Sequence, residues 1–275
     1  MRELSLFTGV GGGALGSKLL GWNTIGYVEF NDYCQRVISQ RIKDGILDHA
    51  PIFSDVRAFI GEGYADAYQG MVDVVTAGFP CQPFSVAGQR KGEDDERNMW
   101  PQTIECIRRI KPRYFFGENV PGLLNCGYFP EILGSLAEAG FDARWIVLGA
   151  DDVGAPHRRK RLWILADSDS ELRRGGGAVG SGGTDAIGRV HPSEEKQTGQ
   201  HVWGEAIGRG SVRGKSERQP PGPWPTEPRL GRVVPHGLAN RNERLKAIGN
   251  GQVSRVFATA WEILSNGETV TIELV

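Results

Sequence analysis

Cys81 is the side chain of this 275-residue sequence best placed to act as a nucleophile. It follows an apolar run that predicts a buried strand at 74–77, in the motif Gly-Phe-Pro-Cys-Gln-Pro-Phe-Ser. A second strand is predicted at 114–117, and Glu118 comes directly after it. Because ligands bind at the carboxyl ends of strands in open α/β sheets, we expect Cys81 and Glu118 to share a pocket. A thiol beside a proton donor is a working arrangement for covalent catalysis.

A glycine-rich turn at 8–13 separates a strand predicted at 3–7 from a helix predicted at 14–20. Its glycines allow a sharp turn and let a ligand approach the backbone. The spacing Gly-x-Gly-x-x-Gly at 11–16 matches the dinucleotide-binding fingerprint, and a plain structural turn is the alternative.

Acidic residues end the next two predicted strands, at 24–29 and 51–55. An acid at such a position accepts hydrogen bonds from ribose hydroxyls in nucleoside-binding α/β folds. Glu29 and Asp55 therefore predict a nucleoside pocket beside the glycine turn. For each acid taken alone, a helix cap or a surface position is the alternative.

A basic cluster at 157–161 leads into a strand predicted at 162–166. Since side chains alternate between the faces of a strand, we expect Arg159 and Arg161 to share the face that points into the pocket. A solvated basic surface is the alternative. The loop at 84–97 is polar and charged, which suits a lid over a substrate.

Apolar periodicity predicts the remaining elements. Residues 249–251 read Gly-Asn-Gly and predict a tight turn, and no element is assigned to 241–248. We expect helices at 32–41, 99–110, 128–139 and 254–264, and a strand at 143–148.

The charge is unevenly distributed along the chain. Residues 1–152 carry 14 Lys and Arg against 20 Asp and Glu, whereas residues 153–260 carry 18 against 10. A basic later part predicts contact with a polyanion. Between 167 and 228, glycine, arginine, serine and proline dominate, so we expect a small, loop-rich or partly disordered domain.

The composition, 39% hydrophobic and 24% charged, is that of a soluble globular protein. No apolar run is long enough to span a bilayer, and the N-terminus has no signal-peptide pattern. The four cysteines form no Cys-x-x-Cys pair. We therefore expect no metal site, no disulfide framework and a cytoplasmic location.

Taken together, these motifs resemble those of the DNA (cytosine-5) methyltransferase family in both order and spacing. The resemblance covers about 1–166 and 230–265. The motifs that carry it lie at residues 6–12, 29, 55, 78–85, 118–120, 157–161 and 249–253.

The resemblance implies a Rossmann-like class I methyltransferase fold, which is an α/β fold with a mostly parallel mixed sheet flanked by helices. It also implies a small loop-rich target-recognition domain. The implied division is a catalytic and cofactor-binding domain at 1–166, target recognition at 167–229 and a return to the catalytic domain at 230–275.

The implied reaction is transfer of a methyl group from S-adenosylmethionine to C5 of a cytosine flipped out of a specific duplex DNA site. Cys81 would add to C6, Glu118 would act near N3, and Arg159 and Arg161 would hold the base. No metal is needed.

Two further sets of residues are implied by the resemblance. The cofactor-binding set is Phe7, Gly9, Gly11, Gly12, Glu29, Asp55, Phe79, Pro80, Trp100, Asn250 and Gln252. The DNA-binding set is Gln82, Ser85 and Arg97. The implied partner is double-stranded DNA, with a separate cognate restriction endonuclease as a possible second partner, and we expect a monomer.

The chain departs from the family pattern at four places. Ser5 stands where many members have Asp, and His157 where most have Gln. Trp100 replaces a common aliphatic residue, and Gly251-Gln252 replaces a small-apolar pair.

Three alternatives stay open. A methyltransferase of the same superfamily acting on a tRNA cytosine would share every catalytic residue. A nicotinamide-dependent oxidoreductase would use the glycine turn and Glu29. A DNA-binding protein could carry an inactive methyltransferase fold. Replacing Cys81 by Ser should abolish activity only for a methyltransferase.

Overall fold

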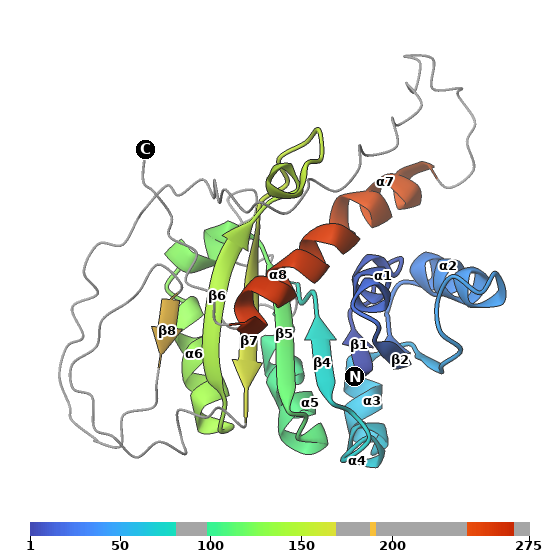
Figure 1. The fold of residues 1–275 in the computed structure, drawn as a ribbon. Helices are drawn as coiled ribbons and strands as arrows, with labels where there is room; N and C mark the ends of the chain where they lie inside the picture. The colour runs from blue at the N-terminus through green and yellow to red at the C-terminus, as the bar shows by residue number, and fades with distance from the viewer. Residues whose placement is uncertain (81–97, 169–187, 191–240, 267–275) are drawn as a thin grey trace.

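The computed structural model describes residues 1–80, 98–168, 188–190 and 241–266. In these parts the chain forms one eight-stranded sheet with the order β3-β2-β1-β4-β5-β7-β6-β8 (Figure 1). Its strands are β1 (Arg2–Leu6), β2 (Asn23–Val28), β3 (Ile52–Phe53), β4 (Val74–Ala77), β5 (Tyr114–Asn119), β6 (Asp142–Leu148), β7 (Arg161–Asp167) and β8 (Gly188–Val190).

The sheet is mostly parallel on one side and antiparallel on the other. Neighbours from β3 to β5 pair in parallel. Strand β7 is inserted antiparallel between β5 and β6, and β8 pairs antiparallel with β6. The predicted α/β fold with a mixed sheet flanked by helices is therefore confirmed. The small recognition domain stays a prediction.

Helices follow most strands. They are α1 (Gly12–Leu19), α2 (Asp32–Lys43), α3 (Val56–Gly61), α4 (Tyr64–Ala67), α5 (Trp100–Ile110), α6 (Phe129–Glu138), α7 (Arg241–Asn250) and α8 (Ser254–Asn266), with short 3-10 turns η3 (Pro121–Asn125) and η4 (Asp151–Val153). Local chemistry sets several starts. The Asn31 side chain, for example, accepts from the backbone N–H of Cys34 at 3.1 Å and caps α2.

Alternating apolar residues give the sheet two buried faces. Phe115 belongs to the core cluster that contains α5 and α6, whereas Phe116 belongs to the cluster that contains α8. Phe116 stacks on Trp163 of β7 with ring centroids 5.5 Å apart. It also meets Phe257 of α8 edge to face at 4.9 Å. Figure 1 shows α8 crossing one face of the sheet, with α5 on the other.

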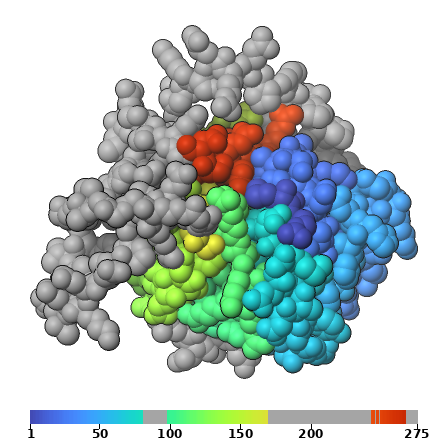
Figure 2. Space-filling view, turned by 60° about the horizontal axis from the view of Figure 1, so that its bottom comes forward, coloured from blue at the N-terminus to red at the C-terminus, as the bar shows by residue number. Residues whose placement is uncertain are grey.

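The C-terminal helix α8 packs directly against the N-terminal helix α1. A Cβ on Gly16 would lie only 2.6 Å from the ring of Phe257, so glycine is required there by packing. The last glycine of the fingerprint-like turn thus serves helix docking. Figure 2 shows described residues of the C-terminal segment, in red, beside N-terminal residues, in blue, on the surface.

Several features differ from the expected elements or their limits, among them α3 and α4, where no element was predicted. Residues 241–248 are helical, and α7 includes Gly249 and Asn250, so the predicted turn is confined to Gly251 and the residues after it. Strand β7 runs to Asp167, one residue past the predicted domain boundary at 166. Residues 188–190, which lie inside the predicted target-recognition interval, form β8 and pair with β6.

None of the helices in the described ranges is long and apolar enough to cross a membrane. Within the same ranges, no three or more His, Cys, Asp and Glu side chains gather as metal ligands would.

Candidate active site

The predicted nucleophile Cys81 lies outside the described residues, as do Gln82, Ser85 and Arg97. The approach to Cys81 is described. Strand β4 ends at Ala77, and the side-chain amide of Asn119, at the end of β5, donates to the carbonyl of Phe79 at 3.1 Å.

Glu118 pairs with Arg161 at the same edge of the sheet. Strand register places Glu118 opposite Trp163, two residues beyond Arg161, so Glu118 and Arg161 point to the same face. The Arg161 Nε lies 2.9 Å from Oε1 of Glu118. Glu118 is 8% exposed, so the carboxyl is buried against the Arg161 guanidinium.

Burial raises the pKa of the Glu118 carboxyl above its ordinary value. The charges of Arg161 and Arg159 and a hydrogen bond from the Gln252 side chain oppose that rise without cancelling it. A carboxyl with a raised pKa keeps its proton to higher pH. Glu118 can therefore serve as a proton donor closer to neutrality than a solvated glutamate could.

Arg159 reaches this cluster by a route other than the predicted one. Strand β7 begins at Arg161, and Arg159 precedes it with a left-handed backbone, φ 36°. The prediction that strand alternation would bring the two arginines together is therefore wrong. Arg159 instead donates to the carbonyl of Gly249 at 2.8 Å and to that of Gly251. It ties the α7–α8 connection to the site while its charge still acts on Glu118.

The predicted cofactor residues Phe7, Gly9 and Gly11 form a turn of positive φ between β1 and α1, with φ 53°, 61° and 88°. A Cβ at Gly9 would meet no atom within 4 Å, so open space adjoins the turn. Glu29 holds the turn, since its carboxylate accepts from the Gly9 N–H at 2.6 Å and from the Asn31 N–H at 2.8 Å.

Asp55 caps a helix, whereas Phe79 and Trp100 pack on each other. The Asp55 side chain caps α3 by accepting from the N–H of Arg57 at 2.8 Å, which is the alternative reading of this acid. Phe79 packs on Trp100 with centroids 5.0 Å apart. Trp100 is 3% exposed, and its indole N–H donates to the Ser135 hydroxyl at 2.9 Å. Trp100 is therefore a fixed, buried side chain against which Phe79 packs. Pro80, the last residue before Cys81, is exposed.

The C-terminal segment places Gln252 inside the site and Asn250 at its surface. A Cβ on Gly12 would collide with the backbone carbonyl of Gln252. The Ser254 hydroxyl donates to the carbonyl of Gly12 at 2.7 Å. The beginning of α8 is thereby held on the glycine turn.

The sequence reading did not single out Phe30. Phe30 follows Glu29 and is 76% exposed, the largest exposed fraction among the large apolar side chains that the structure describes. An aromatic residue directly after a predicted ribose-binding acid was the available signal.

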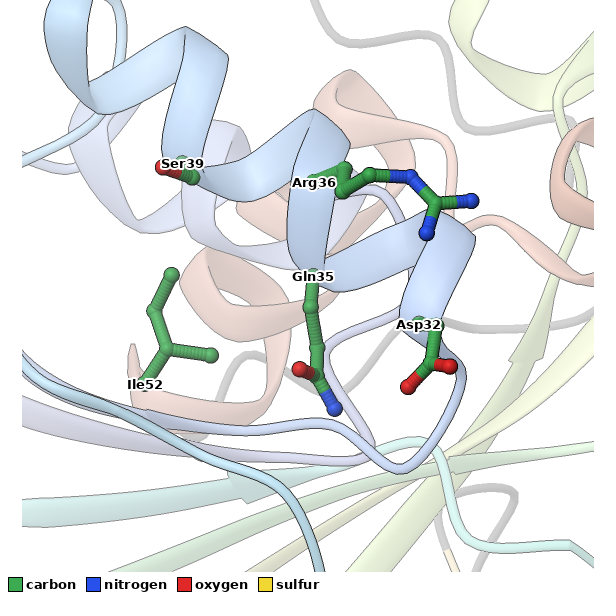
Figure 3. A pocket seen from close by; sticks show the side chains of 5 residues that line it. All are labelled: Asp32, Gln35, Arg36, Ser39 and Ile52. Carbon is green, nitrogen blue, oxygen red and sulfur yellow. The ribbon is translucent and has the colours of Figure 1, made fainter.

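A hollow of about 310 Å³ lies between α2 and β3, lined by Asp32, Gln35, Arg36, Ser39 and Ile52 (Figure 3). None of the predicted site residues lines it. The Gln35 amide donates to the carbonyl of Glu29 at 2.7 Å, so the hollow adjoins the backbone behind that acid.

Comparison with known proteins shows which family the sequence resembles. A family model for C-5 cytosine-specific DNA methylase matches residues 1–198. The type II methyltransferase M.NgoMIV of Neisseria gonorrhoeae is 33% identical over 168 residues, covering 60% of this chain and 51% of that protein. M.CviJI of Paramecium bursaria Chlorella virus IL3A is 31% identical over 167 residues, covering 60% and 42%.

The chain therefore spans about half the length, or less, of these curated relatives. Among solved structures, S. pombe Dnmt2 methyltransferase matches with a TM-score of 0.48 and 20% identity, over 66% of this chain and 57% of that one. Because this similarity is so distant, no conclusion about the fold or the function of the chain is drawn from it.

Proposed function

Because the chain belongs to the C-5 cytosine-specific DNA methylase family, we propose that it methylates C5 of a cytosine flipped out of a specific duplex DNA site. The methyl donor would be S-adenosylmethionine, and Cys81 would form a covalent bond to C6 of the base. The observation that carries the proposal is the buried Glu118–Arg161 pair, 2.9 Å apart, at the sheet edge where the chain leads into Cys81.

C5 of cytosine is too weak a nucleophile to take a methyl group directly, and the proposed chemistry overcomes this by activating the ring. The Cys81 thiolate adds to C6 and breaks the C5–C6 double bond, so the electron pair becomes available at C5. Glu118 shares a proton with N3, which neutralises the negative charge that the addition places on the ring. After C5 takes the methyl group, a base removes the C5 proton, the double bond reforms and Cys81 leaves as a thiolate.

Arg161 and Arg159 have separate parts in this proposal. Arg161 fixes the Glu118 carboxyl and can direct an N–H toward the O2 atom of the base, since its guanidinium offers several donors. Arg159 is bound to the carbonyls of Gly249 and Gly251. We propose that it contributes positive charge and holds the C-terminal segment, with any contact to the base secondary.

The described residues fit the proposed cofactor. When bound, S-adenosylmethionine supplies an activated methyl group. The positive-φ turn at Phe7, Gly9 and Gly11, which adjoins open space at Gly9, would receive its methionine part. Glu29 already accepts two backbone N–H groups, and its carboxylate has lone pairs left for ribose hydroxyls. Phe30 offers an exposed aromatic face for the adenine ring, and the second carboxylate oxygen of Asp55 can accept from the adenine amino group.

We assign recognition of DNA to parts of the chain that lie mostly outside the described residues. Gln82, Ser85 and Arg97 would contact the flipped nucleotide from the loop after Cys81, and 167–229 would read the sequence. Since the similar relatives are named type II methyltransferases, a separate restriction endonuclease is the proposed partner. The monomeric state and the cytoplasmic location remain expectations.

The proposal is tested by producing the protein in a bacterium that lacks cytosine methylation and sequencing the host DNA for 5-methylcytosine. Methylation at one recurring motif, absent with the Cys81→Ser variant, is the expected result. If folded protein that binds S-adenosylmethionine leaves host DNA unmodified but methylates cytosine in the host tRNA, duplex DNA is the wrong substrate.

A further inference from the structure

Gln252 fills the space between the glycine turn and the acid of the site. A Cβ on Gly13 would collide with its side-chain oxygen, and a Cβ on Gly78 would lie 3.1 Å from its side-chain nitrogen. These two glycines lie on different elements, one at the start of α1 and one just after β4. The Gln252 amide therefore occupies the volume that side chains at both positions would need.

The same amide reaches the carboxyl of Glu118. A Cβ on Gly78 would lie 3.1 Å from the Gln252 side-chain nitrogen and 3.4 Å from Oε2 of Glu118, so the two groups adjoin the same point. The Gln252 amide acts on Glu118 as a hydrogen-bond donor that lowers the pKa of the carboxyl. Because an ionised carboxylate only accepts, the amide N–H must face Glu118. The amide oxygen then faces the first turn of α1, where backbone N–H groups lack helical partners.

Glu118 is thus held by donors from two directions. Arg161, on the neighbouring strand β7, lies against Oε1. Gln252, in the connection before α8, lies on the side of Oε2. When each carboxyl oxygen accepts from its own donor, the plane of the carboxyl group is fixed. With a single donor, the carboxyl group can still rotate about that hydrogen bond. A polar side chain at 252, where the motif resemblance leads one to expect a small-apolar pair, supplies the second donor.

We propose that Gln252 is a positioning residue for Glu118, which orients the carboxyl toward the base and fixes it relative to the glycine turn. This inference rests on the proposed function for its effect on methylation, and on geometry alone for its effect on Glu118. It revises the expectation that Gln252 acts mainly as a cofactor contact.

The decisive test follows Glu118 itself. Carbon-13 NMR of glutamate carboxyls, with the Glu118 signal assigned from the Glu118→Gln variant, gives the titration of this one group in the full chain without any requirement for activity. Gln252→Met keeps the length of the side chain and removes the N–H donor. Since that donor favours the ionised carboxylate, the pKa of Glu118 should rise in Gln252→Met.

Gln40→Met is the matched control. Gln40 lies on α2, and its amide donates to the carboxyl of Asp44 at 2.8 Å on the exposed surface. Gln40→Met therefore removes a hydrogen bond from a glutamine amide to a carboxyl group, as Gln252→Met does, but at a place away from the site. The Glu118 titration in Gln40→Met should match that of the unmodified protein. An unchanged Glu118 titration in folded Gln252→Met would overturn the inference.

Methylation and cofactor binding give the functional arm. Misplacement of a catalytic group by a fraction of an ångström to 1 Å lowers rates by about 10–100-fold, so kcat/KM of Gln252→Met should fall by that factor. Because Gln252→Met removes no cofactor contact, the dissociation constant for S-adenosylmethionine should stay within about 3-fold of that of the unmodified protein. A change of about 3-fold corresponds to less than the 1.4 kcal/mol that changes affinity tenfold. If cofactor affinity is lost while the titration of Glu118 is unchanged, Gln252 is a cofactor ligand and the inference is wrong.

The two failures are distinguishable. If the unmodified protein does not methylate cytosine but Glu118 titrates at higher pH in Gln252→Met, the proposed function fails and the positioning contact stands. If methylation occurs and both the titration and kcat/KM of Gln252→Met match the unmodified protein, the function stands and the inference fails.

Discussion

Glu118 combines two opposing effects at one carboxyl group. Burial raises its pKa, while Arg161, Arg159 and Gln252 lower it, and burial dominates. The ion pair with Arg161 is needed because a lone buried carboxylate would be strongly destabilising. A partly buried pair, with the Arg161 side chain 21% exposed, keeps the acid in place and leaves it able to hold a proton.

The energy of this pair can be measured by a double-mutant cycle with Glu118→Gln and Arg161→Met. Arg161→Met should destabilise the protein most, because it leaves a buried carboxyl unpaired, and adding Glu118→Gln should restore much of the loss. We expect a coupling energy of about 1–3 kcal/mol from urea unfolding at pH 7. Additive effects would show that the 2.9 Å contact contributes nothing to stability.

A second buried carboxyl, Glu3, predicts a pH dependence of stability. Glu3 is 0% exposed, and it accepts from the hydroxyls of Thr24 and Thr76, both at 2.6 Å. Burial raises its pKa above the ordinary 4.5. The folded state therefore holds this proton more tightly than the unfolded state, and the stability present below pH 4.5 is lost as pH rises through the folded pKa.

Glu3→Gln should remove this contribution, so its free energy of unfolding should fall less than that of the unmodified protein as pH is raised from 4.5. Urea unfolding at a series of pH values measures the difference. Glu62→Gln, which changes an exposed glutamate, should keep the original slope. Equal slopes for Glu3→Gln and the unmodified protein would mean that Glu3 titrates alike in both states.

Residue types and spacing predicted the acid, the glycine turn and Glu29, because each follows directly after a readable strand. They could not predict how Arg159 is held, since its left-handed backbone lies outside the strand. Nor could they predict that Gln252 reaches Glu118, because that contact joins residues far apart in the sequence. The predicted roles of all site residues, Cys81 included, remain to be tested.

The docking of α8 on α1 is the contact between elements that most clearly depends on one residue. Gly16→Ala would place a Cβ 2.6–2.8 Å from three atoms of Phe257. Overpacking of this kind costs about 1–3 kcal/mol, so the variant should unfold at lower urea concentration. Because the beginning of α8 is held on the glycine turn by the hydrogen bond from Ser254 to Gly12, S-adenosylmethionine should bind more weakly as well.

Gly134→Ala is the control for that prediction. Gly134 lies in α6, and a Cβ there would meet no atom within 4 Å. A glycine-to-alanine change in an open helical position stabilises by about 0.5–1 kcal/mol. If Gly16→Ala were as stable as Gly134→Ala, the described α1–α8 contact would be wrong.

Most strands and helices were predictable because their apolar residues follow the expected period. The helix α7 was missed, since Asn242, Glu243, Arg244 and Lys246 are exposed and give no apolar signal. The antiparallel insertion of β7 between β5 and β6 is set by pairing between distant segments. Single strands do not reveal such pairing.

For the whole molecule, the described residues build one eight-stranded sheet, and the proposed target-recognition segment at 167–229 lies largely outside them. Deleting 191–220 would keep β8, which pairs with β6. The shortened protein should bind S-adenosylmethionine within about 3-fold of the full chain and lose its preference for one DNA motif. Calorimetry and sequencing of methylated DNA measure the two properties. Loss of cofactor affinity together with sequence preference would show that the domain division is wrong.

The central claim is that Cys81 attacks C6 of a DNA cytosine, and a covalent trap tests it most directly. Random-sequence duplexes carrying 5-fluorocytosine in place of cytosine present every short site, and fluorine at C5 blocks the final elimination. Incubation with S-adenosylmethionine should give a protein–DNA adduct that survives denaturation and carries one added methyl group. The Cys81→Ser variant should give none. If folded, cofactor-binding protein forms no adduct that depends on Cys81, the proposed mechanism is contradicted.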